Sequence, residues 1–135
     1  MTKIELADQK HRAGYNCAQA VACVFAEEVG MDEALLYKVC EGFGGGLGCA
    51  KGQCGALSGA VVLAGIVNSD GDIDHPAQTK AATTKLSAAM LKIFTEKAGA
   101  LICGDIKGAG QGKPLTSCAD CITIAVEAVQ EVLGL

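Results

Sequence analysis

Residues 54–68 read Cys-Gly-Ala-Leu-Ser-Gly-Ala-Val-Val-Leu-Ala-Gly-Ile-Val-Asn, a stretch that is apolar on nearly all sides of a helix. Such a pattern is typical of a helix buried at the centre of a bundle. Gly55 and Gly59 lie one turn apart and would let a neighbouring backbone approach closely. The sequence therefore predicts an all-α fold, a bundle of five to six helices around a buried central helix that starts near Cys54.

Helix start and stop signals recur along the rest of the chain, with capping residues at Thr2, Asn16 and Ser117. Besides the central helix, we expect helices over residues 3–13, 17–29, 33–42, 76–97 and 118–133. Glycine-rich stretches at 42–48 and 108–114 are expected to be loops, since each Gly costs about 1 kcal/mol relative to Ala in a helix. No stretch has the composition of a linker, so we expect residues 1–135 to form a single domain.

Composition and charge exclude several classes of function. The formal net charge is −4 and no basic run exceeds residues 10–12, so nucleic acid is not an expected partner. The longest apolar stretch, residues 56–67, is shorter than the roughly 20 residues that a membrane span needs. The polar N-terminus has no apolar leader segment, and we therefore expect a cytoplasmic protein. In a reducing cytoplasm, eight cysteines indicate metal binding or redox chemistry more than permanent disulfides.

The cysteines divide by their place in the expected helices. Cys17, Cys54 and Cys118 fall at helix starts, where unpaired N–H groups and the helix dipole favour thiolate. Cys23 and Cys40 fall mid-helix among apolar residues, which is typical of small core side chains. Cys103 follows a helix stop, and its position does not separate packing from ligation.

Two spacings add candidates to this set. Cys118 and Cys121 form a C-x-x-C at a helix start, and Cys49 and Cys54 form a C-x4-C after the glycine loop. Either spacing suits two ligands of a zinc or iron–sulfur site, and the C-x-x-C also suits a dithiol. A thioredoxin-like interpretation needs a βαβ context, and the sequence has no convincing strands.

The sequence lacks the motifs of nucleotide, phosphate and calcium binding. The glycine loops match neither the dinucleotide-binding nor the phosphate-binding pattern, and the run that begins at Asp70 fails as a calcium loop. The two histidines, His11 and His75, lie in polar surroundings, and His75 is a minor candidate for a fourth metal ligand. Without an acid–base constellation, a hydrolase is not expected.

An ordered set of motifs resembles one known family. The set comprises Asn-Cys-Ala-Gln at 16–19, the glycine loop at 44–48, Cys-Gly-Ala-Leu-Ser-Gly-Ala at 54–60, Cys103, and Cys118 at the start of the last helix. In this order they resemble the C_GCAxxG_C_C family of redox-active proteins. The resemblance implies that Cys17, Cys54, Cys103 and Cys118 are the signature cysteines, with Cys49 and Cys121 as additions. It also implies a bound prosthetic group such as an iron–sulfur cluster.

Together the residues and the resemblance predict a redox protein without an assigned enzymatic reaction. The leading hypothesis is an iron–sulfur cluster held by the four signature cysteines at converging helix N-termini, which passes electrons to a partner oxidoreductase or a transporter-associated redox protein. One alternative is a metal-free dithiol/disulfide switch that uses Cys118 with Cys121, or Cys49 with Cys54. Another is a structural zinc site without a redox role. The Ala- and Gly-rich composition is also compatible with a homodimer.

Overall fold

The computed structural model describes residues 1–108 and 112–135, and within these ranges the fold is all-helical, with no strand. The helical elements in chain order are α1 (Lys3–Arg12), α2 (Cys17–Cys23), α3 (Glu33–Cys40), the 3-10 turn η1 (Glu41–Phe43), the π-type turn η2 (Gly46–Ala50), α4 (Gly55–Asn68), α5 (Lys80–Ala98), α6 (Cys103–Ile106) and α7 (Cys118–Leu133). None of the helices described is both long and apolar enough to cross a membrane.

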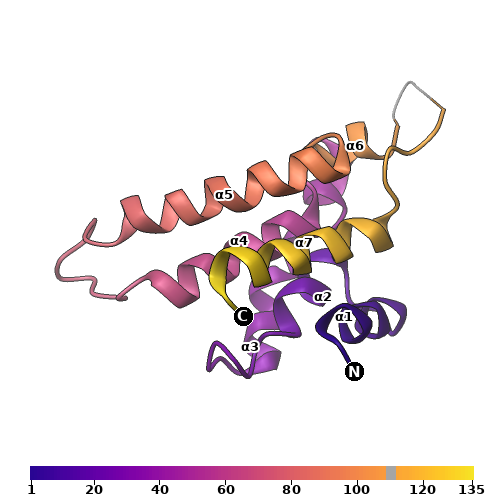
Figure 1. The fold of residues 1–135 in the computed structure, drawn as a ribbon. Helices are drawn as coiled ribbons and strands as arrows, with labels where there is room; N and C mark the ends of the chain where they lie inside the picture. The colour runs from indigo at the N-terminus through magenta and orange to yellow at the C-terminus, as the bar shows by residue number, and fades with distance from the viewer. Residues whose placement is uncertain (109–111) are drawn as a thin grey trace.

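The three longest helices lie alongside one another, with α1, α2 and α3 on one side of them (Figure 1). Helices α4 and α7 start at the same end of the molecule, and α5 runs in the opposite direction and ends there (Figure 1). Helix α4 packs against α2, α5 and α7. This arrangement places the N-termini of α4 and α7 close to the short helix α6.

The first half of α4 is enclosed by the other helices. Every residue from Gly55 to Ala60 is buried, whereas Val67 near the end of the helix is 45% exposed. A Cβ atom added at Gly59 would lie only 2.4 Å from the backbone oxygen of Ala18 in α2. The glycine therefore allows α2 and α4 to cross with their backbones in contact, as the small-residue spacing predicts.

The hydrophobic core is continuous through the bundle. Its largest fully buried side chains include Phe25, Phe94, Leu36, Leu57 and Met90. These residues come from segments that are far apart in the sequence, so burial of apolar surface joins the two halves of the chain.

Two predicted helix boundaries are wrong. The second helix ends at Cys23 instead of continuing to residue 29. The N–H groups that follow bond to the carbonyl three residues back instead of four, from Phe25 to Ala22 and from Ala26 to Cys23. The fifth helix begins at Lys80 instead of Pro76. Residues 76–79 contain Ala77 at φ +77°, a left-handed conformation that a right-handed helix does not accommodate.

The glycine-rich stretches differ in part from simple loops. Residues 41–43 form the turn η1 and residues 46–50 form η2, which contains left-handed Leu47 and Gly48. In the second expected loop, at 108–114, residues 109–111 lie outside the described residues.

Candidate functional site

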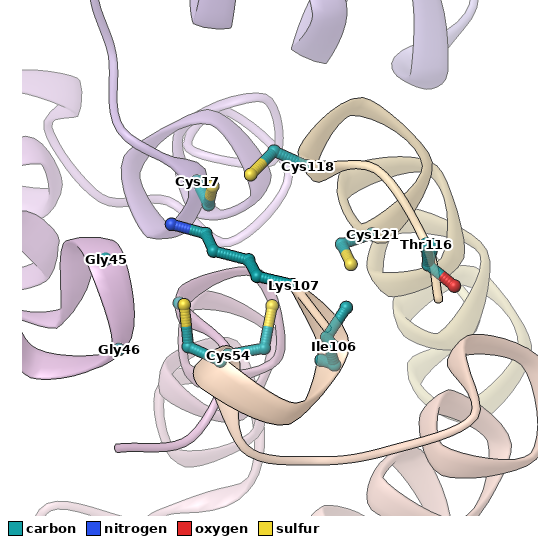
Figure 2. A pocket seen from close by; sticks show the side chains of 11 residues that line it. Cys17, Gly45, Gly46, Cys54, Ile106, Lys107, Thr116, Cys118 and Cys121 are labelled. Carbon is teal, nitrogen blue, oxygen red and sulfur yellow. The ribbon is translucent and has the colours of Figure 1, made fainter. Parts of the chain in front are cut away.

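A small cavity gathers five of the eight cysteines. Its volume is about 30 Å³, room for one or two water molecules. Four separate helices contribute the thiols that line it, namely Cys17 from α2, Cys54 at the start of α4, Cys103 from α6, and Cys118 and Cys121 from α7 (Figure 2). The remaining lining residues are Gly45, Gly46, Gly55, Ile106, Lys107 and Thr116.

Each of the four signature cysteines stands at a helix start. Cys17 and Cys118 are the first residues of α2 and α7, and their helices are capped by Asn16 and Ser117, whose side-chain oxygens accept backbone N–H bonds at 2.9 and 3.0 Å. Cys54 occupies the N-cap position of α4. The cavity is therefore surrounded by helix N-termini, which carry partial positive charge.

Cys103 also begins a helix, which sequence reasoning did not foresee. It is the first residue of the four-residue helix α6. The available signal was Asp105, an acidic residue in the first turn, but a single turn is too short for periodicity to reveal it.

A short backbone pairing brings Cys54 and Cys103 together. The N–H of Cys54 donates to the carbonyl of Leu101, and the N–H of Cys103 donates to the carbonyl of Gly52, both at 2.9 Å. These bonds flank an isolated antiparallel bridge between Gln53 and Ile102. Two segments that are about fifty residues apart thus enter their helices side by side.

Glycines of the 44–52 loop allow the wall of the cavity to close. A Cβ atom at Gly46 would lie 2.4 Å from the Cβ of Cys103, closer than real contacts allow. Gly46 also has φ +62°, where L-residues are strained. Neighbouring Gly45 has nearly the same φ, +64°, but a Cβ atom added there would have no heavy atom within 4 Å. Close packing thus requires glycine at position 46, whereas only backbone conformation favours it at position 45.

The Cys54 thiol is the activated one. A hydrogen bond from the Cys121 thiol lowers the pKa of Cys54 to about 7, against the opposing effect of burial. The nearby N–H groups of Ala56 and Leu57 and the charge of Lys107 also lower this pKa. The lowered pKa agrees in direction with the position of Cys54 at a helix start.

Burial dominates at the neighbouring thiols. It raises the pKa of Cys17 to about 12, and the nearby Cys118 and Cys54 add to this effect. The pKa of Cys121 is strongly raised, first by its hydrogen bond to Cys54 and then by burial. At Cys17, desolvation opposes the effect of the helix N-terminus.

Lys107 is the cationic residue in the lining of this cavity, and sequence reasoning missed it. Its side chain extends across the cavity, with the amino group directed toward Cys17 (Figure 2). The residue follows α6 as its C-cap. Only the fold shows that this lysine faces the thiols of the cavity.

Other candidates lie outside the cavity. Cys49 is exposed, and its Sγ is 3.8 Å from the carbonyl oxygen of Gly46. His75 is exposed in a turn, with its Nδ1 2.9 Å from Asp72. Cys23 and Cys40 are buried in the core, as predicted. Although Cys49 and Cys54 have the spacing of a ligand pair, Cys49 does not line the cavity that contains Cys54.

The chemical type of the donors, cysteine thiols, suits a soft metal. Thiolates are the ligands that zinc and iron–sulfur clusters prefer. Within residues 1–108 and 112–135, however, no group of three or more His, Cys, Asp or Glu side chains is arranged to hold a metal ion. The thiols line one space.

The fold and the cavity define a class, that of small all-helical proteins with cysteines from several helix N-termini gathered at one site. Residues 15–132 match the model of the family described as "Putative redox-active protein (C_GCAxxG_C_C)", and the chain belongs to this family. No curated protein and no solved structure matched the chain.

Proposed function

We propose that this protein is a redox protein whose cysteine-lined cavity binds an iron–sulfur cluster through Cys17, Cys54, Cys103 and Cys118. The observation that carries the proposal is the convergence of these four thiols, from four helices, on one cavity. Membership in a family described as redox-active supports the same conclusion. When bound, an iron–sulfur cluster supplies one-electron transfer.

The surroundings of the thiols favour an anionic ligand set. Four helix starts direct partial positive charge toward the cavity, and Lys107 adds a full positive charge. Hydrogen bonds and dipoles of this kind stabilise thiolates and raise the reduction potential of a cluster.

The proposed physiological role is electron transfer at this site. The protein would accept electrons at the cavity and pass them to a partner oxidoreductase or a transporter-associated redox protein in the cytoplasm. Lys107 is exposed beside the thiols and offers a positive charge at the approach to the cavity. We therefore expect a partner to approach from the side of the molecule where α6 lies.

Anaerobic purification followed by iron, zinc and sulfide analysis tests the proposal. We expect brown protein with stoichiometric iron and sulfide, and Cys54→Ser should lose both. Cys49→Ser is the matched control, because this thiol is exposed outside the cavity, and it should retain the full metal content.

Two outcomes would overturn the assignment. Colourless protein with stoichiometric zinc would identify a structural metal site, the alternative without a redox role. Full iron and sulfide in Cys54→Ser would show that the cavity is not the binding site.

A further inference from the structure

Exposed lysines flank the short helix α6 on two sides. A Cβ atom added at Gly104 would lie only 2.9 Å from the backbone oxygen of Ala50, which places the next residue, Lys51, beside the helix. On the other side, a Cβ atom added at Gly108 would collide with the backbone carbonyl of Lys113. Both lysines are exposed. Two segments that are far apart in the sequence thus each bring a lysine to α6.

A third lysine and two leucines complete this surface. Lys107 is the exposed C-cap of α6 and lines the cavity. The N–H of Leu115 donates to the carbonyl of Ile106 at 2.7 Å. Leu47 lies over Gly52, whose carbonyl accepts the N–H of the first residue of α6. The two leucines are 57% exposed at position 47 and 49% exposed at position 115. We call this surface the α6 face, and it comprises Leu47, Lys51, Lys107, Lys113 and Leu115.

The α6 face has a local charge opposite to that of the whole chain, which carries a formal net charge of −4. Against its three lysines stand one acidic residue of α6, Asp105, and one in the first turn of α7, Asp120. Among the residues that the structure describes, no ion pair joins any of these three lysines to a carboxylate, whereas Lys3, Lys10 and Arg12 of α1 are all paired. The positive charge of the face is therefore available to a partner.

We propose that the α6 face is the docking surface for the electron-transfer partner, and that this partner presents an acidic protein surface with apolar side chains. Complementary charge steers two proteins together and fixes their orientation, and apolar contacts then hold them. Docking here would place the partner beside Lys107 and the exposed thiol of Cys118, both of which line the cavity. The transfer of electrons rests on the proposed function, whereas binding depends on the face alone.

Leu47 supports a role for this face in binding. Its φ of +62° is a left-handed conformation that residues other than Gly, Asn and Asp adopt infrequently. Its side chain covers Gly52 but leaves more than half of its surface exposed. Packing within the chain therefore accounts for only part of this leucine. A partner that buries the exposed part would offset the cost of the backbone conformation.

The test uses a plant-type [2Fe–2S] ferredoxin, an acidic electron carrier, as the probe protein. Calorimetry at about 10 mM salt should show binding that is lost at about 1 M, where the Debye length falls from about 30 Å to about 3 Å. A carbodiimide, which couples amines to carboxylates, should crosslink the probe to Lys51, Lys107 and Lys113. Cytochrome c, a basic electron carrier, should not bind at this face.

Variants separate the face from the rest of the surface. Lys51→Gln and Lys113→Gln should each weaken binding of the ferredoxin by about 2- to 5-fold at low salt. Lys85→Gln is the matched control, because this exposed lysine lies in the first half of α5, away from α6 (Figure 1), and should bind as the wild type does. Leu47→Asn should weaken binding without lowering the urea midpoint, because Asn tolerates the left-handed conformation. Circular dichroism checks that each variant is folded.

Several outcomes would overturn the docking surface. These are no binding of the ferredoxin, crosslinks at Lys85 in place of the three lysines of the face, or equal binding of a short DNA duplex, which would indicate a general affinity for polyanions. Iron analysis of the same samples separates this inference from the proposed function. Binding at the α6 face by anaerobically purified protein without iron would leave the docking surface standing and overturn the cluster, whereas iron without binding would do the reverse.

Discussion

Cys54, at the N-cap of α4, and Cys121, in the first turn of α7, line the same cavity, and so two helix N-termini meet at a pair of thiols. The interaction between the two thiols lowers the pKa of Cys54 and raises that of Cys121. The cysteines of this site therefore differ in thiol pKa, although the sequence does not distinguish them in this respect. The predictions below test this inequality and the packing that produces it.

The first prediction concerns the titration of Cys54. Because its pKa is lowered from 9.0 to about 7, the ultraviolet absorbance of thiolate should show one step near pH 7 in reduced, metal-free protein. Cys54→Ser should abolish this step. Cys121→Ala removes the side chain that donates to Cys54, and the step should move to higher pH. A step near pH 7 that persists in Cys54→Ser would assign the activated thiol to another residue.

Stability should depend on pH through the same group. Between pH 7 and 9, folded protein has lost the Cys54 proton that the unfolded chain still binds, so the free energy of unfolding rises with pH across this window. The full contribution, present above pH 9, is at most roughly 2 to 3 kcal/mol and is lost as the pH falls through 7. Urea denaturation at pH 7 and pH 9 measures it.

At higher pH the free energy of unfolding should fall with pH instead of rising, and this decline provides a control. Burial raises the pKa of Cys17 and of Cys23 to about 12 and that of Cys40 to about 11, so above pH 9 the unfolded chain loses protons that the folded protein retains, and stability falls. In Cys54→Ser the rise between pH 7 and 9 should vanish, whereas the decline above pH 9 should remain. Equal slopes in wild type and variant would contradict the assignment.

Lys107 should influence the cavity through its charge. Lys107→Gln removes a positive charge that stabilises the Cys54 thiolate, and the thiolate step should shift to higher pH. The shift should be smaller than in Cys121→Ala, because Lys107 is exposed and its effect is screened by salt. Lys107→Arg retains the charge and should titrate as the wild type does. A similar shift in both variants would indicate packing as the cause.

The glycine loop offers a matched pair of substitutions. Gly46→Ala and Gly45→Ala carry nearly the same backbone strain, about 1 to 2 kcal/mol, because both residues are left-handed. Only Gly46→Ala forces a Cβ against Cys103. We therefore expect Gly46→Ala to lose metal binding and Gly45→Ala to retain it at somewhat lower stability. Equal metal content in the two variants would show that Cys103 does not need this close contact.

Helix α4 supplies a second matched pair. Gly59→Ala places a Cβ against the backbone of Ala18 and should destabilise the protein by about 1 to 3 kcal/mol. Gly65→Ala, in the same helix with nothing within 4 Å, should stabilise it by up to about 1 kcal/mol. Denaturant midpoints of the two variants should therefore move in opposite directions. Movement of both in the stabilising direction would contradict the close crossing of α2 and α4.

Local sequence signals predict most of the helices. The capping boxes at Thr2 and Asn16 and the cap at Ser117 form as expected, because a capping bond joins residues only three positions apart. The errors occur where tertiary packing overrides propensity, after Cys23 and between Pro76 and Lys80.

The candidate site shows the same division. The chain itself determines that Cys17, Cys54 and Cys118 stand at helix starts, because the caps and apolar periodicity are local properties of the sequence. Only the tertiary structure decides which thiols meet. Cys121 lines the same cavity as Cys54, and Lys107 enters this cavity while Cys49 does not. These outcomes depend on helix crossings and loop closure between distant segments, which no local pattern encodes.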